Sequence, residues 1–181
     1  SREAGSCGAS SSTDEQELNT ASTTSTMYFK YLYDEENRQN AAIWSPLADG
    51  FEYSKLAGAG VPSCNTPQLT QANNMWSIAC NIRDEMEDVI PVLVTRNLDA
   101  ATLKTTYTPA AGGSKTDVAT WDNQFKTPFS DKGFVMVRKG GAIFKGRGRY
   151  RQFSVIYNNT YFDTAQGSGA GGSPALKYLK P

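Results

Sequence analysis

Two adjacent glycines between short apolar runs constrain the fold of this chain more than any other feature. Gly140 and Gly141 separate the run Phe134–Val137 from the run Ala142–Lys145. A two-residue hairpin turn of type I′ needs positive φ at both central positions, which glycine adopts readily. The pair therefore predicts an antiparallel hairpin with Gly140 and Gly141 in its turn.

The same region predicts a third strand. After the short linker 146–148, one set of apolar residues alternates with another set of residues: Phe153, Val155 and Tyr157 with Gln152, Ser154 and Ile156. Such alternation is typical of a strand with one buried face, so residues 133–157 are expected to form a three-strand meander. The cross-strand pairs expected at the turn are Val137 with Phe144 and Arg138 with Ile143.

A helix near the start is the element expected to cover the apolar face of this meander. Thr13 and Gln16 stand at capping-box spacing, which predicts a helix from about Asp14 to Asp34. Its apolar face would carry Leu18, Ala21, Ser25, Tyr28, Phe29 and Leu32. The expected fold class is α+β, with this N-terminal helix packed on an antiparallel sheet and a C-terminal meander hairpin.

The rest of the chain predicts one domain with two strands before the meander. Met75–Cys80 and Ile90–Thr95 are the two strand-like runs. At 181 residues a single core is expected. The predicted organisation is a flexible lead over residues 1–12, a folded domain over 13–163 and a Gly/Ser-rich tail over 164–181. Long loops are expected at 47–71 and 97–132.

The chain contains no histidine, which excludes catalysis and zinc binding through imidazole. Its three cysteines are Cys7, Cys64 and Cys80. A Cys64–Cys80 disulfide is favoured over a pairing with Cys7, and would stabilise the fold by about 3 kcal/mol in the chain-entropy model. A disulfide would imply an oxidising compartment, whereas three reduced thiols would be typical of the cytosol.

Charge is balanced overall and unevenly distributed. Residues 1–125 hold 8 Lys and Arg against 16 Asp and Glu, a net charge of −8, and residues 126–181 hold 10 against 2, a net charge of +8. Such a chain is suited to contacts between copies of itself, or to contact between its own two parts.

Two charged clusters are candidate sites. A basic stripe is expected to be solvated or to face another subunit, with phosphate binding as the alternative; it comprises Arg138, Lys145, Arg147, Arg149 and Arg151. An acidic turn could hold calcium but is expected to be simply solvated, because the EF-hand pattern is missing; it comprises Asp84, Glu85, Glu87 and Asp88. No cofactor and no nucleic-acid partner are expected.

Three segments in this order resemble bacterial type IV pilins and type II secretion pseudopilins. Tyr28–Leu32 with Ala42–Trp44 is similar to the end of the pilin helix and the segment that follows it. Asn74–Ile78 with Val89–Leu93 resembles two pilin strands, and Gly133–Gly141 resembles a terminal hairpin. The apolar N-terminal half-helix of the family is missing, and the resemblance implies that it precedes Ser1 in a longer protein.

The resemblance implies a structural, non-enzymatic subunit that assembles with itself and with other pilin-like subunits. Residues 13–163 would be the headpiece, anchored to the inner membrane or carried in a filament at the cell surface. The missing half-helix is needed because the longest apolar run, Val89–Val94, is far shorter than the ~20 residues that span a membrane. The alternative is an extracellular adhesin or carbohydrate-binding module, with Trp44 and Trp121 as its platform; a carboxylate-dependent hydrolase is disfavoured.

Overall fold

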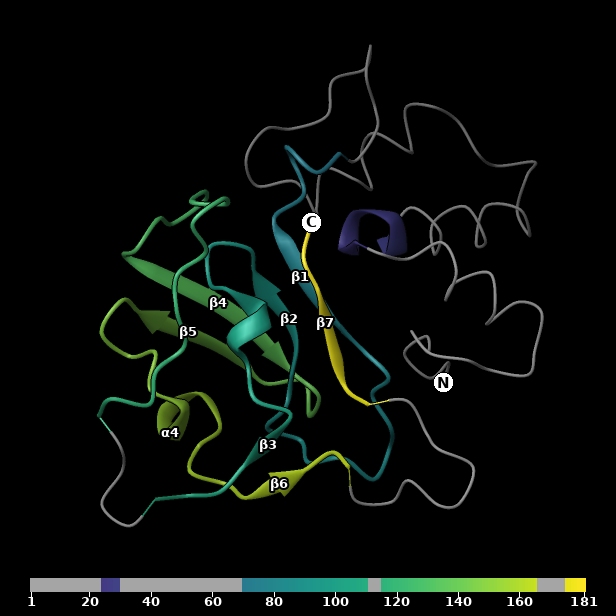
Figure 1. The fold of residues 1–181 in the computed structure, drawn as a ribbon, viewed down its shortest axis with the longest axis vertical. Coiled ribbons are helices and arrows are strands. Elements are labelled where there is room, and N and C mark those ends of the chain that lie inside the picture. Colours follow the sequence, from purple (N-terminus) through teal and green to yellow (C-terminus); the bar gives the residue numbers. More distant parts are fainter. Residues whose placement is uncertain (1–23, 30–69, 111–114, 166–174) are drawn as a thin grey trace, which may run out of the picture.

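A computed structural model describes residues 24–29, 70–110, 115–165 and 175–181 (Figure 1). Its main element is a five-stranded antiparallel sheet in the order β5-β4-β2-β1-β7, and β3 and β6 pair separately. The bounds are β1 (Trp76–Cys80), β2 (Pro91–Thr95), η1 (Ala100–Thr102), β3 (Thr106–Tyr107), β4 (Gly133–Arg138), β5 (Ile143–Arg147), α4 (Phe153–Ile156), β6 (Phe162–Asp163) and β7 (Lys177–Leu179).

The two strands expected before the meander are confirmed as β1 and β2. Their alternating side chains place one row on the core face of the sheet, where Ser77 faces Val94 and Val94 faces Met136. All three side chains are fully buried. The next row, on the opposite face, is also apolar and consists of Ile78, Leu93, Val137 and Ile143.

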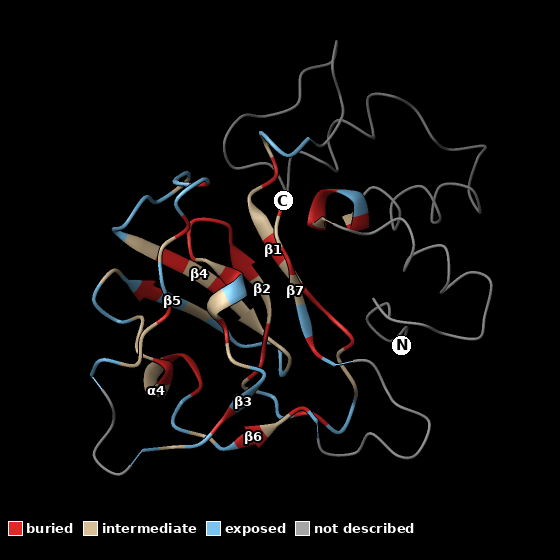
Figure 2. Ribbon diagram, viewed as in Figure 1, coloured by how far each residue is buried: buried red, intermediate tan, exposed pale blue. Residues whose placement is uncertain are grey.

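The core face is covered by irregular segments of the chain rather than by a helix. The excursion after β2 folds back over the sheet, and the segment after β5 joins it, so that buried residues converge between these segments and the sheet (Figure 2). Tyr157 lies at the centre, stacked on Phe153 at 5.7 Å and edge-on to Phe162 at 4.7 Å between ring centroids. Its hydroxyl accepts a hydrogen bond from the backbone N–H of Lys104 at 2.8 Å, which satisfies this buried polar group.

The predicted α+β pilin-like fold is wrong. The described residues are mostly antiparallel sheet, and their helices are short: residues 25–29, α4 and the single turn η1. Residues 25–29 contact β1 and β7, where Tyr28 packs with Cys80 and Leu179, rather than the β4–β5 hairpin. The other residues of the expected helix 14–34 lie outside the described ranges.

The described part of the expected helix also buries polar side chains. Ser25 and Thr26 are buried, and both hydroxyls accept hydrogen bonds from the Asn74 side chain at 2.9 and 3.0 Å. Ser25 in turn donates to the carbonyl of Trp76 at 2.6 Å. Serine and threonine are weak helix formers, so this short helical segment depends on these side-chain hydrogen bonds for its stability.

The predicted third strand of the meander is wrong as well. Residues 153–156 form the helical turn α4, in which Phe153, Ile156 and Tyr157 are buried. Spacings of three and four residues place side chains on one face of a helix. The alternation in this segment also satisfied a period of two, which is why the sequence favoured a strand.

The strand β7 was not predicted from the sequence. Residues 177–179 belong to the expected C-terminal tail, yet they pair with β1 and complete one edge of the large sheet. Ile78 lies opposite Leu179 in this pairing. Among the helices that the structure describes, none has both the length and the apolar character needed to span a membrane.

Candidate binding surface

The β4–β5 turn contains three residues rather than two. The N–H of Arg138 donates to the carbonyl of Ala142 at 2.9 Å, and the N–H of Gly141 donates to the carbonyl of Arg138 at 2.8 Å. Of Gly140 and Gly141, only Gly141 has a positive φ, at 83°. This is a type I turn followed by a left-handed residue, so the expected type I′ turn is wrong. The observed pairs are Met136 with Phe144 and Val137 with Ile143, one residue from the expected register.

The predicted basic stripe is divided among different structural environments. Arg138 is half-buried, and its guanidinium donates to the carbonyls of Val155 and Ile156 at 3.2 and 2.6 Å. It also lies 5.2 Å from the centre of the Phe144 ring. Burial lowers the pKa of Arg138. This side chain therefore ties the end of α4 to the sheet and is not available to a partner.

Arg149 and Arg151 do not extend the stripe either, because each lies over an aromatic ring. Arg151 donates to the carbonyl of Ala119 at 2.8 Å and covers the Trp121 ring at 5.3 Å. Arg149 lies over the ring of Tyr150, its neighbour, at 4.9 Å. Trp121 is therefore a packed aromatic residue beneath an arginine rather than an open platform for a sugar. Trp44 and residues 47–69 lie outside the described ranges.

Lys145 and Arg147 remain exposed on β5 and border a groove with Lys132. Within the described ranges, no carboxylate pairs with any of these three side chains. The groove has a volume of about 450 Å³. We call it the basic groove, and it is lined by Pro128, Phe129, Lys132, Gly133, Phe134, Val135, Lys145, Gly146 and Arg147.

An aromatic ring forms the floor of the basic groove because Gly146 has no side chain. A Cβ built on Gly146 would lie 2.3 Å from Cζ of Phe134, so the ring occupies this space. Phe134 is 1% exposed and contacts the Phe144 ring with 5.8 Å between centroids. Phe129 lines the groove and is 40% exposed. The groove thus combines an apolar interior with three cations.

The predicted acidic turn is exposed and lies beside the β4–β5 turn. Asp88 pairs with Lys139 at 3.4 Å, and its carbonyl accepts from the N–H of Gly140 at 3.1 Å. A hydrogen bond from Arg83 is the main cause of the lowered pKa of Glu85. Across the part of the chain that the structure describes, no three carboxylate or cysteine side chains could hold a metal ion together. The candidate residues Asp84, Glu85, Glu87 and Asp88 are therefore not gathered into such a group.

Two of these carboxylates border a second hollow, of about 300 Å³. Tyr161 lies beside it and is 48% exposed. We call it the acidic groove, and it is lined by Glu85, Met86, Glu87, Ile90, Tyr161, Phe162, Asp163 and Thr164. The two grooves are oppositely charged, since lysine and arginine are the only charged residues that line the first and carboxylates the only ones that line the second.

Cys80 is disulfide-bonded at the end of β1. It is completely buried and packs with Leu179 of β7. Cys64 and Cys7 both lie outside the described residues, so the Cys64–Cys80 pairing stays a prediction.

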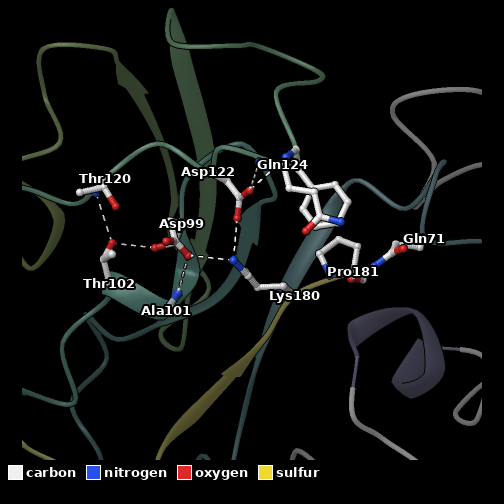
Figure 3. Close-up of polar contacts among 10 residues, drawn as sticks. Gln71, Asp99, Ala101, Thr102, Thr120, Asp122, Gln124, Lys180 and Pro181 are labelled. Atoms are coloured by element: carbon white, nitrogen blue, oxygen red, sulfur yellow. Dashed lines mark hydrogen bonds and ion pairs between the residues drawn. The ribbon is translucent and has the colours of Figure 1, made fainter.

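A polar cluster that the sequence did not predict holds the C-terminus (Figure 3). Lys180 pairs with Asp122 at 2.8 Å and with Asp99 at 3.2 Å. Burial alone would raise the pKa of Asp122, but hydrogen bonds from Lys180 and from the N–H groups of Phe125 and Gln124 lower it. The hydrogen bond to Asp122 raises the pKa of Lys180. Both groups are therefore stabilised in their charged forms, which suits a structural anchor.

Arg96 is a second missed structural residue. It is 5% exposed and lies directly after β2. Its guanidinium donates to backbone carbonyls on two loops at 2.9–3.1 Å, namely those of Gln71, Ala72, Asn74 and Thr127. Burial lowers its pKa. A single arginine after a buried strand gives no sequence signal for such a role.

The chain matches no known protein-family model, no curated protein and no solved structure.

Proposed function

We propose that this chain is a binding domain of an oxidising compartment, and that the basic groove takes an acidic partner. The observation that carries the proposal is the placement of Lys132, Lys145 and Arg147 around one groove without carboxylate partners among the described residues. Like charges held together raise the local potential and attract anions. A partner with carboxylates would relieve this repulsion.

The apolar part of the groove supports a peptide or protein partner over a simple ion. Phe129 is large, aromatic and partly exposed beside the cations. Aromatic residues and arginines are enriched among the residues that dominate binding energies at protein interfaces. An acidic segment that also carries an apolar side chain would match both features of the groove.

The compartment is inferred from Cys80. Stable disulfides form in oxidising environments and are rare in the cytosol. Two other polar clusters among the described residues have structural contacts that account for them, since Lys180 anchors the C-terminus and Arg96 joins two loops. These observations favour binding over catalysis as the work of this domain.

The filament-subunit role is a separate hypothesis that was inferred through the pilin-like fold. The pilin-like fold was wrong, so that route to the hypothesis is lost. The described residues still support one part of it, which is association through opposite charges. The adhesin alternative keeps its general form, a binding module, but its ligand would contact the basic groove rather than Trp121.

The test is fluorescence anisotropy with a labelled oligoglutamate peptide that contains one phenylalanine, and with its oligoglutamine counterpart. We expect the acidic peptide to bind, and to bind more weakly as salt rises from about 0.01 to 0.15 M, because the Debye length falls from about 30 to 8 Å. The variant Lys145→Glu/Arg147→Glu should bind at least about tenfold more weakly, which corresponds to about 1.4 kcal/mol.

The matched control reverses two other exposed lysines, as Lys115→Glu/Lys177→Glu, and so changes net charge equally. Both variants should unfold at the temperature of the native protein. Equal losses of binding in the groove variant and the control would show that only net charge matters. No binding of the acidic peptide at low salt would overturn the proposal.

A further inference from the structure

The two oppositely charged grooves lie at opposite ends of the β4–β5 hairpin, and Figure 1 shows the course of that hairpin. The basic groove is at the open end, where Gly133 faces Arg147. The acidic turn is at the closed end, where Asp88 contacts Lys139 and Gly140, and it continues into the acidic groove. Five residue steps separate the ends of β4, a distance of about 17 Å at strand spacing.

We propose that copies of this chain associate head to tail, with the acidic groove of one copy against the basic groove of the next. This inference rests on the proposed function and names its partner. The acidic ligand of the basic groove is the surface formed by Glu85, Glu87 and their neighbours on a second copy.

Charge complementarity favours a second copy as the partner. The whole chain is neutral, with 18 basic and 18 acidic residues, so copies do not repel one another through net charge. Each groove also has an exposed aromatic residue, Phe129 on the basic side and Tyr161 on the acidic side. Such residues supply desolvated contacts beside the charges.

The position of the grooves decides the kind of assembly. A two-fold dimer would bring both grooves of one copy against the same second copy, whereas a head-to-tail contact uses one groove of each copy and leaves the other groove free. The assembly therefore grows beyond a dimer unless its rotation closes a ring. Exposed charges dominate the contact, so it should weaken strongly with salt.

The experiment is sedimentation velocity at low salt, about 0.01 M, and at about 0.15 M, over a range of protein concentrations. One variant neutralises the basic groove, Lys145→Ala/Arg147→Ala, and the other neutralises the acidic groove, Glu85→Gln/Glu87→Gln. We expect the native chain to form species larger than a dimer at low salt and each variant to remain a monomer. Lys115→Ala/Lys177→Ala should associate as the native chain does.

An equal mixture of the two groove variants is the decisive sample. One variant still has its acidic groove and the other its basic groove, so they should form a dimer and stop there. A native chain that stays monomeric at low salt, variants that still associate, or a mixture that stays monomeric would overturn the inference. If the native chain is monomeric but still binds oligoglutamate, the proposed function stands and only the head-to-tail inference is overturned. If the native chain neither associates nor binds oligoglutamate, the proposed function is overturned as well.

Discussion

Replacing Gly146 with alanine tests whether the Phe134 ring fills the space beneath β5. The added Cβ would lie 2.3 and 2.4 Å from two carbons of that ring. Carbon atoms pack best at about 3.5–4.0 Å, so the ring must retreat by more than about 1 Å. Trp121 and Phe144 contact the other parts of the ring, and Phe134 is 1% exposed, which leaves little room for that movement.

The expected loss of stability follows from two opposing terms. Overpacking a core typically costs about 1–3 kcal/mol. Replacement of glycine by alanine stabilises by about 0.4–1 kcal/mol where the backbone conformation is allowed, and Gly146 does not have a positive φ. The net expectation for Gly146→Ala is a loss of about 1–2 kcal/mol, or about 2–8 °C in Tm for a domain of this size.

The assay is urea unfolding followed by tryptophan fluorescence, in a double-mutant cycle with Phe134→Leu. Leucine lacks the outer ring carbons, so Gly146→Ala should cost at least about 1 kcal/mol less in the leucine background. Gly141→Ala is the matched control. No atom lies within 4 Å of its Cβ, but its φ is 83°, so it should cost about 1–2 kcal/mol in both backgrounds. An equal cost of Gly146→Ala in both backgrounds would refute the proposed packing.

Three further changes test other parts of the structure. The pKa of Asp122 is lowered in the folded protein, so its carboxylate contributes to folding stability above its unfolded pKa of about 3.9. That contribution is lost as pH falls through the folded pKa. Urea unfolding of Asp122→Asn should therefore show a smaller loss of stability between about pH 5 and pH 2 than the native protein shows. Cys64→Ser should leave two thiols that react in denaturant without reductant if Cys64 bonds Cys80, and none if Cys7 does. Arg96→Lys should lower stability by at least about 2 kcal/mol in the same assay, because an ammonium cannot reach two loops at once and leaves buried carbonyls unsatisfied.

The sequence predicted those elements whose pattern is set by burial on one face. In β1 and β2 the alternation of side chains predicts which of them face the core. Ser77 and Val94 are paired across the two strands and are both buried there. The N-terminal helix was predicted from six positions on one helical face. Only residues 24–29 of that region are described, and there Ser25 and Thr26 are buried through hydrogen bonds to Asn74. Burial of hydroxyls in this way has no periodic signature.

The hairpin shows why a local signal can predict an element and still miss its register. The glycine pair predicted a turn, and a turn is present. Its shape depends on distant residues, because the N–H of Lys139 donates to the carbonyl of Ile90 at 2.8 Å and the N–H of Gly140 to that of Asp88 at 3.1 Å. These long-range bonds favour the three-residue loop, and they cannot be inferred from the residues of the turn itself.

The residues of the predicted basic stripe lie in different environments for a related reason. Residues of one parity share a face only while the chain remains a strand, and β5 ends at Arg147. Beyond that point the backbone turns, and Arg149 and Arg151 pack on Tyr150 and Trp121. The groove that replaces the stripe needs Lys132, which directly precedes β4, and the missing side chain of Gly146. The sequence shows how charge is distributed along the chain. A binding surface forms only where packing leaves several charged side chains exposed around one groove, and the sequence does not show that packing.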